Sequence, residues 1–552
     1  MIIRIEIQGE DPITREYHEP VCIRTIADEF QQKHPFRIVL ARFDRHVRRL
    51  DEMISRSGTL ELLDMRDSGG KMCYQASLIL LYDRAIHDVA GKKVRIRVNN
   101  SLSKGLYITL KGTAVDEDLV RSVENRMKEL VEQSIPIQKI NSNRDNIIEA
   151  LRTRDREDLV ENIEVTPDLE NVSLYQLGES IAAFSDELVP DTGYIDLFEV
   201  KQYKYGTLLR FPHPRNPASV PPFEEQRILY DAFSEERRWS KITNVRMVSD
   251  LNRMILSGEY KDLILLCEAL HEKKIAAIAD RIAEEKKRII LIAGPSSSGK
   301  TTFANRLCIQ LRAIGLKPLY LGTDDYFLDR SNTPLGEDGK PDFEGLSALD
   351  LELLNRDLSA LLSGEEADIP RYDFKEGVKE FGKRITKILP AQPIVIEGLH
   401  CLNPALTSQI PDEDKFRIYI SPLTQLNIDQ NNRIPTTDAR FLRRIVRDAQ
   451  FRGYSAAMTI DMWPKVNRGE DTNIFPFSSN ADAFFNSQSV YELAILKKYA
   501  KPQLERITDR QPEFAEAQRL LRMLKYVVTI EDDHIVPNKS ILREFIGGSV
   551  IV

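Results

Sequence analysis

One stretch constrains the fold of this chain more than any other: residues 288–311, RIILIAGPSSSGKTTFANRLCIQL. Residues 294–301 match G-x-x-x-x-G-K-[ST], the pattern of a phosphate-binding loop. Before the loop, residues 289–293 form a short apolar run that predicts a buried parallel strand. After it, Phe303, Leu307, Leu311 and Ile314 recur at helical spacing. Strand, loop and helix therefore follow in the order that such a loop requires.

The residue types in the loop suit a nucleoside triphosphate. Its two glycines allow the backbone to approach phosphate oxygens, and the N–H groups at the start of the helix attract negative charge. Lys300 would neutralise the outer phosphates, and Thr301 would offer its hydroxyl to Mg²⁺. We therefore expect ATP and Mg²⁺ as cofactors. The residues expected to contact the nucleotide are Gly294, Pro295, Ser296, Ser297, Ser298, Gly299, Lys300, Thr301 and Thr302.

Length and charge limit the alternatives. A chain of 552 residues is too long for one core, and we expect roughly three or four domains. The net charge of −8 argues against wholesale binding of nucleic acid or anionic membrane, although a local basic patch stays possible. The five cysteines are scattered singly, and the N-terminus lacks the apolar region of a signal peptide. We expect a cytoplasmic protein without a membrane span.

Residues 1–65 have the pattern of a small α+β unit. Strands are predicted at residues 2–7, 36–43 and 58–63, and a helix at residues 25–34. This order resembles the TGS domain, a β-grasp module of threonyl-tRNA synthetases and some GTPases. The arginines and histidine within residues 42–49 could contact RNA or form the solvated face of a hairpin.

Residues 66–222 mix strands, at 94–98 and 105–110, with an amphipathic helix at 116–132. The region resembles the second additional domain of threonyl-tRNA synthetases. That family carries an H-x-x-x-H editing motif, but the matching stretch here, residues 74–78, reads YQASL. We therefore expect a non-catalytic binding or scaffolding domain. A proline-rich linker and a helical connector over residues 223–285 lead to the last domain, residues 286–552.

This last domain is predicted to be a doubly wound parallel sheet. Strands at residues 289–293, 317–321, 393–396 and 416–420 alternate with helices, and ligands gather beyond the carboxyl ends of such strands. Asp324 or Asp325 could orient and deprotonate a hydroxyl there, or both could cap a turn. Glu397 follows another strand and is the expected partner of Thr301 at the metal.

Arginines recur further along, in DARFLRRIVRDAQFRG. At helical angles, Arg440, Arg443, Arg444 and Arg447 fall within about a third of a turn, and apolar residues line the rest. The face could be merely solvated. Because no acidic partners occur at matching spacing, we expect instead a lid that carries guanidinium groups to the γ-phosphate.

The motifs GPSSSGKTT, TDDYF, RYDF, IEGLH and RRIVRDAQFRG together resemble the uridine kinase and phosphoribulokinase group of P-loop kinases. The resemblance implies ATP-dependent phosphorylation of a nucleoside 5'-hydroxyl. It makes Asp324 the general base and implies catalytic roles for Lys300 and the lid arginines Arg444, Arg447 and Arg452.

The chain departs from this group on the acceptor side. Glu344 stands where uridine kinases carry an aspartate, Gly377 where they carry a histidine, and Tyr454 where they carry a last lid arginine. A sugar phosphate or a pantothenate-like alcohol is therefore an alternative acceptor. An RNA- or ribosome-associated NTPase is a third hypothesis. The residues expected to bind the acceptor are Asp324, Tyr326, Glu344, Tyr372 and Phe374.

An aromatic-rich segment at residues 473–486 could cover the acceptor or pack between subunits, and we expect a homo-oligomer.

Overall fold

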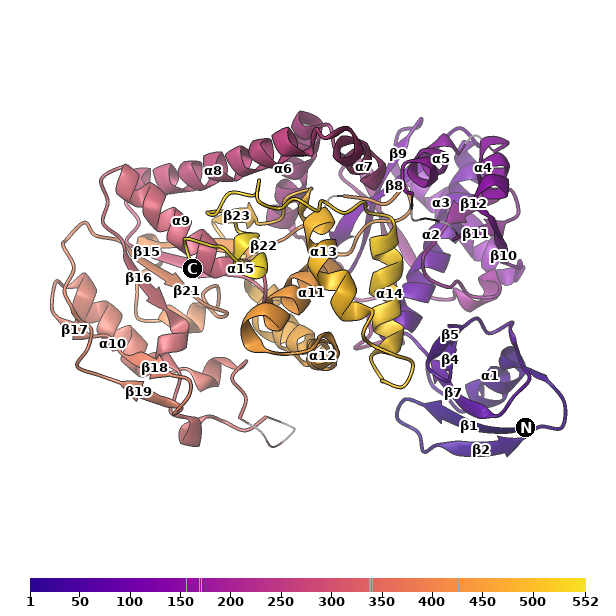
Figure 1. The fold of residues 1–552 in the computed structure, drawn as a ribbon, viewed down its shortest axis with the longest axis horizontal. Helices are drawn as coiled ribbons and strands as arrows, with labels where there is room; N and C mark the ends of the chain where they lie inside the picture. The colour runs from indigo at the N-terminus through magenta and orange to yellow at the C-terminus, as the bar shows by residue number, and fades with distance from the viewer. Residues whose placement is uncertain (155, 168, 170, 337–338, 340, 425) are drawn as a thin grey trace.

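The structure, a computed structural model, describes residues 1–154, 156–167, 169, 171–336, 339, 341–424 and 426–552. The N-terminal strands and the parallel C-terminal sheet lie at opposite ends of the long axis, with helices from later in the chain between them (Figure 1). No helix among the described residues is long and apolar enough to cross a membrane.

The first unit is a mixed sheet with one helix packed against it. Its elements are β1 (Ile2–Ile7), β2 (Ile13–Glu16), β3 (Val21–Cys22), α1 (Ile23–Gln31), β4 (Leu40–Phe43), β5 (His46–Arg48), β6 (Met53–Ile54) and β7 (Gly58–Leu63). The sheet order is β2-β1-β7-β4-β5, with β1 and β7 parallel. The predicted strands at residues 2–7 and 58–63 are confirmed. The predicted strand at 36–43 begins only at Leu40, although Ile38 and Val39 before it are already buried.

The second unit contains two antiparallel sheets around long helices. Its elements are α2 (Ser68–Ala90), β8 (Arg95–Leu102), β9 (Gly105–Lys111), α3 (Glu117–Glu132), β10 (Gln138–Asn143), α4 (Arg144–Arg152), α5 (Glu157–Glu164), β11 (Asn171–Leu177), β12 (Ser180–Ala183), β13 (Glu199–Tyr203) and β14 (Gly206–Arg210). The sheet orders are β13-β14-β9-β8 and β10-β11-β12. The predicted helix is confirmed as α3, which starts where the Asp116 side chain accepts from Leu119 N.

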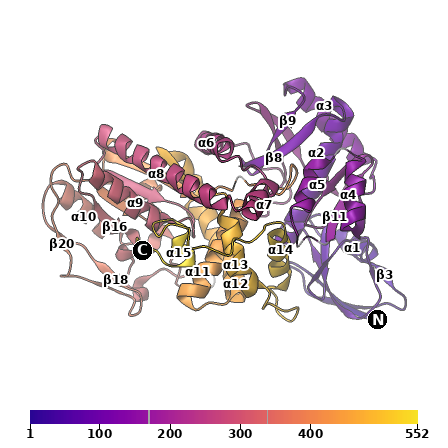
Figure 2. The ribbon, with the colours of Figure 1, turned by 45° about the horizontal axis from the view of Figure 1, so that its top comes forward.

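Three helices fill the expected helical segment: α6 (Arg227–Thr243), α7 (Val248–Ser257) and α8 (Tyr260–Glu284). The helices are separated at Gly258, whose φ of 83° ends α7, and at Asn244, whose φ of 56° ends α6. Helix α8 runs beside α9 (Lys300–Ala313), and its Ile275, Ile278 and Ile282 share a core with the parallel sheet (Figure 2). The boundary expected at residue 285 stays a prediction.

The predicted parallel sheet is confirmed, with order β16-β21-β15-β22-β23. Its strands are β15 (Ile289–Ala293), β16 (Leu319–Gly322), β21 (Ile394–Glu397), β22 (Lys415–Ser421) and β23 (Ala483–Asn486). The edge strand β23 was not expected from the sequence. It lies in the aromatic-rich segment, and Phe485 is fully buried against Phe303. The apolar run of β23 is too short for its spacing to indicate a strand. Since Phe485 is buried in the core, its ring does not cover an acceptor.

Further elements surround this sheet. They are α10 (Leu351–Leu362), the short strands β17 (Ala367–Asp368) and β20 (Ile385–Thr386), the hairpin β18 (Arg371–Asp373) and β19 (Val378–Glu380), α11 (Thr436–Arg447), α12 (Ala456–Asn473), α13 (Glu492–Leu504), α14 (Phe514–Lys525) and α15 (Arg543–Ile546).

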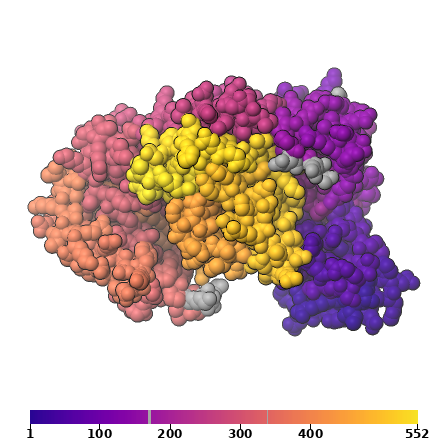
Figure 3. Space-filling view, in the orientation of Figure 1, coloured from indigo at the N-terminus to yellow at the C-terminus, as the bar shows by residue number. Residues whose placement is uncertain are grey.

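The two halves of the chain are packed together. Val98 N donates to Gln430 O over 2.9 Å, and Asn427 Nδ2 donates to Val98 O over 2.7 Å. One apolar core combines residues of α4, α5 and α7 with residues of α11 to α14. In the space-filling view the C-terminal residues, in yellow, cover the middle of the visible face (Figure 3).

Candidate active site

The phosphate-binding loop connects β15 to α9 as predicted. Gly299 has φ of 83° at the helix start, a conformation that favours glycine. A Cβ at Gly294 would lie 2.1 Å from Ile420 O, so the close approach of β22 also requires glycine there. Lys300 Nζ donates to Gly294 O over 3.0 Å and lies across the loop.

The two predicted metal ligands are in contact. Thr301 Oγ1 donates to Glu397 Oε1 over 2.9 Å, and Tyr320 OH donates to the same oxygen over 3.0 Å. The contact arises because β21 pairs with both β15 and β16, so that their carboxyl ends meet at one sheet edge. A hydroxyl beside a carboxylate is an oxygen donor set that fits Mg²⁺.

The two aspartates after β16 have different surroundings. Asp325 Oδ2 pairs with Arg384 Nη1 at 2.6 Å, and its Oδ1 accepts from Tyr372 N at 3.3 Å. No such hydrogen bond to the Asp324 carboxylate is found in the described part of the chain, and its side chain can be reached from solvent. Desolvation by the surrounding protein, then the charge of Glu397, raises the pKa of Asp324 to about 6, while Lys300 opposes the shift. Asp324 is thus the aspartate that is free to act as a base.

The arginine face of α11 is divided between two roles. Arg440 and Arg443 are buried: Arg440 pairs with Glu470, and Arg443 pairs with Glu492 at 2.5 Å. Arg440 Nε donates to Ser296 O over 3.1 Å, and Arg443 Nη1 donates to Ser297 O over 3.2 Å. These two arginines hold the backbone of the loop, and each guanidinium group is already paired with a buried carboxylate.

The expected absence of acidic partners at matching spacing is wrong, because Asp448 lies four positions after Arg444 and four positions before Arg452 and pairs with both. Arg440 and Arg443 also have acidic partners, Glu470 and Glu492, from other helices. These two carboxylates come from α12 and from the first turn of α13, at sequence distances that helical spacing cannot show.

The three predicted lid arginines gather around one buried carboxylate, that of Asp448. Their ion pairs with it span 3.3 Å from Arg444, 2.8 Å from Arg447 and 3.6 Å from Arg452. Arg444 Nη1 also donates to Ser296 Oγ over 2.9 Å, which brings the cluster to the loop. Planar donors beside the loop suit phosphate oxygens, and their catalytic role stays a prediction.

The acceptor-side residues do not form one group. Tyr326 is fully buried and its hydroxyl donates to Asp357 over 3.3 Å, so its expected contact with an acceptor is replaced by a place in the core. Tyr372 is nearly buried, whereas Phe374 is 60% exposed, and their ring centres lie 5.1 Å apart.

Glu344 and Gly377 mark the two positions where the chain departs from uridine kinases. Burial, then the charge of Glu470, raises the pKa of Glu344, and the charge of Arg444 opposes this shift. Gly377, with φ of 76°, packs on Arg330, where a Cβ would lie 2.8 Å from that side chain.

Several residues at the loop were not identified from the sequence. Tyr320 donates to Glu397, Glu470 accepts from Ser296, and Glu544 accepts from Thr302. The two residues of each pair are more than 70 positions apart in the sequence. A carboxylate alone in a helix, or a tyrosine inside a strand, has no pattern that indicates such a contact.

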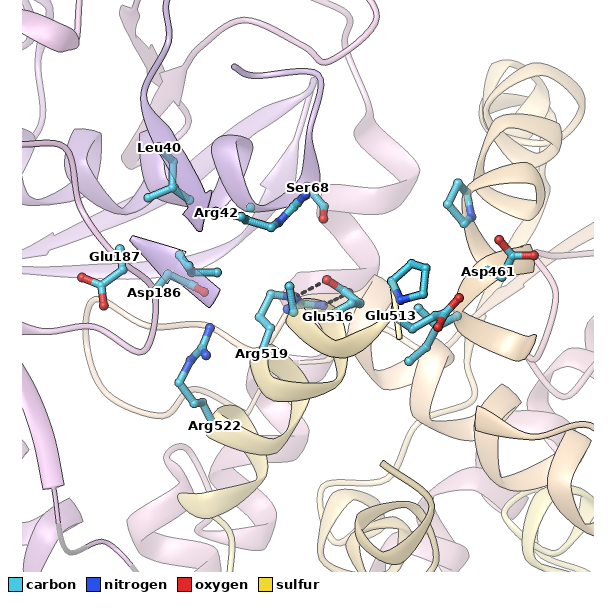
Figure 4. A pocket seen from close by; sticks show the side chains of 16 residues that line it. Leu40, Arg42, Ser68, Asp186, Glu187, Asp461, Glu513, Glu516, Arg519 and Arg522 are labelled. Atoms are coloured by element: carbon cyan, nitrogen blue, oxygen red, sulfur yellow. Dashed lines mark hydrogen bonds and ion pairs between the residues drawn. The ribbon is translucent and has the colours of Figure 1, made fainter. Parts of the chain in front are cut away.

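A cavity of about 230 Å³ lies away from the loop, where the N-terminal unit meets α12 and α14 (Figure 4). Its charged lining is largely paired: Arg42 binds Glu61 and Asp67, and Arg519 binds Asp438 and Glu516. We assign no chemistry to this cavity.

Comparison with known proteins concerns mainly the C-terminal part. The profile of the phosphoribulokinase / uridine kinase family matches residues 289–494. A uridine kinase of Ligilactobacillus salivarius is 32% identical over 180 residues, which cover 33% of this chain and 75% of that protein. A threonine–tRNA ligase of Syntrophotalea carbinolica is 27% identical over 201 residues, which cover 36% of this chain but only 31% of the ligase. A solved structure described as a possible uridine kinase from Bacillus stearothermophilus aligns with a TM-score of 0.26 and 21% identity, over 39% of this chain and 97% of that one.

Proposed function

Because the chain belongs to the phosphoribulokinase / uridine kinase family, we propose that it transfers the γ-phosphoryl group of ATP to the 5'-hydroxyl of a nucleoside. The observation that carries this proposal is the different bonding of the two aspartates after β16. Asp325 is tied to Arg384, whereas the Asp324 carboxylate is accessible and has a raised pKa. An accessible carboxylate beside a phosphate-binding loop suits a general base for an alcohol.

In this mechanism each residue has a definite task. The N–H groups of the loop and Lys300 hold the phosphates of ATP, and Thr301 with Glu397 would hold Mg²⁺, which supplies charge neutralisation when bound. Asp324 orients the acceptor hydroxyl and takes its proton. Arg444, Arg447 and Arg452 place positive charge over the transferred group once it draws their guanidinium groups away from Asp448.

A second candidate keeps the reaction and changes the acceptor to a sugar phosphate or a pantothenate-like alcohol. Two observations favour it: Glu344 is longer than the aspartate of uridine kinases, and Gly377 is closed off by Arg330. The test is incubation with ATP, Mg²⁺ and a panel of nucleosides, sugar phosphates and pantothenate, with ADP release measured. Stimulation by nucleosides alone supports the first candidate, and stimulation only by another class replaces it.

We further propose that residues 1–65 and 66–222 form TGS-like and synthetase-like binding domains without an editing activity. The threonine–tRNA ligase relative supports this proposal. The stretch that replaces the editing motif lies inside α2, where Tyr74, Ser77 and Leu78 are buried.

A nucleotide-driven RNA switch is less well supported. Three of the four arginines expected to contact RNA have carboxylate partners: Arg42 has Glu61 and Asp67, Arg48 has Glu52, and Arg49 has Asp51. Cytoplasmic location and a homo-oligomer stay predictions.

A further inference from the structure

A carboxylate from the end of the chain lies on the first turn of α9. Glu544 Oε2 accepts from Thr302 Oγ1 over 2.6 Å and from Thr302 N over 3.3 Å. Thr302 is fully buried, so no water competes for these donors from outside. Glu544 thus satisfies one of the N–H groups that an α-helix leaves free at its start.

These donors are of the kind that a nucleotide needs. In a phosphate-binding loop, the N–H groups of the loop and of the following helix start hold the α- and β-phosphates. The Glu544 carboxylate and a phosphate would both accept from the same N–H group, so they compete for it. Since both are anions, they also repel each other at short distance. No ion pair to Glu544 is found within the described ranges, so its charge is not neutralised by a basic side chain.

The backbone that carries Glu544 is held firmly in place. Ile541 is buried on Gly299, where a Cβ would lie 2.4 Å from Ile541 Cγ2. Phe545 is also buried, and the guanidinium carbon of Arg443 lies 4.8 Å from the centre of its ring. Arg443 also donates to Ser297 O, so this one side chain contacts both residues 541–545 and the phosphate-binding loop. The Glu544 side chain itself is only half-buried, so it can rotate away while the segment stays.

We propose that Glu544 is an internal competitor for nucleotide, which lowers the affinity of the loop for ATP until a bound phosphate displaces its carboxylate. The proposal rests on the loop being the ATP site, as argued above. Under this proposal the affinity for nucleotide depends on residues 541–545 as well as on the residues of the loop.

The test is a measurement of ATP binding by titration calorimetry for the full-length protein and for Glu544→Gln. The glutamine keeps the shape and one oxygen acceptor but removes the charge. We expect the Kd for ATP to fall about tenfold, which corresponds to about 1.4 kcal/mol. Glu531→Gln is the matched control: it removes one charge from an exposed residue of the same C-terminal segment, and its Kd should equal that of the natural protein.

Other outcomes separate the possibilities. If Glu544 only caps α9, the variant melts at a lower temperature and binds ATP equally or more weakly, and the proposal is overturned. Glu544→Ala, assayed in parallel, must also bind more tightly if competition is the cause. If the natural protein binds ATP and neither variant binds it more tightly, only this inference fails; if none of the three proteins binds ATP, the proposed function fails with it.

Discussion

Thr301 Oγ1 donates to Glu397 Oε1 over 2.9 Å and so joins the first turn of α9 to the carboxyl end of β21. The two residues are 96 positions apart, and each is an oxygen ligand of the kind Mg²⁺ prefers. We predict that Glu397→Gln raises the Mg²⁺ concentration needed for activity and lowers kcat by about 10–100-fold, because the amide keeps the hydrogen bond but not the charge. ADP formation across a Mg²⁺ titration measures both effects. Glu413→Gln, at an exposed site, is the control; an unchanged Mg²⁺ requirement in Glu397→Gln would contradict the assignment.

Replacement of Asp324 should remove the base without removing the nucleotide site. We expect Asp324→Asn to lower kcat by about 10²–10⁴-fold while ATP affinity changes little. Asp325→Asn is the natural comparison, because it loses the ion pair with Arg384 and should change the acceptor KM more than kcat. Steady-state kinetics on both variants decide the matter. Equal losses of kcat in the two would show that Asp324 has no special role.

The raised pKa of Asp324 predicts an acid limb in the pH profile. A base acts when deprotonated, so kcat/KM for the acceptor should fall as pH drops through about 6, the pKa of this carboxyl. At an ordinary pKa the fall would come about two pH units lower. Because the charge of Glu397 contributes to the raised pKa, Glu397→Gln should move the limb to lower pH. A profile that is flat from pH 5 to 7 would argue against Asp324 as the base.

The buried pair of Arg440 and Glu470 predicts a large effect on stability. Both side chains are at most 2% exposed, and Glu470 Oε1 also accepts from Ser296 N over 2.8 Å. Glu470→Ala leaves a buried charge unpaired, so we expect the free energy of unfolding to fall by about 3–5 kcal/mol. Denaturant titration measures this change. The double variant Arg440→Met, Glu470→Leu should recover part of the loss; if it is as unstable as Glu470→Ala, the unpaired charge is not the cause.

Local patterns predicted the elements that position the site. The apolar run before Gly294, the glycines of the loop and the helical spacing after it determine β15, the loop and α9. The short strands that end at Gly322 and Glu397 were also predicted to within a few residues, because each is a short apolar run followed by polar residues or a glycine. Tyr326 was expected to contact the acceptor but is buried in the core. The sequence of a short turn does not show which of its side chains points into the core.

The sequence by itself thus determined a phosphate-binding loop, a parallel sheet and the acids at its edge, since each depends on residues close together in the chain. Only the tertiary structure decided which charged residues meet. It tied Asp325 to Arg384 and left Asp324 accessible, paired Arg440 with Glu470, and set Glu544 on Thr302. These contacts depend on how distant helices and strands pack, and no periodicity in the sequence records that packing.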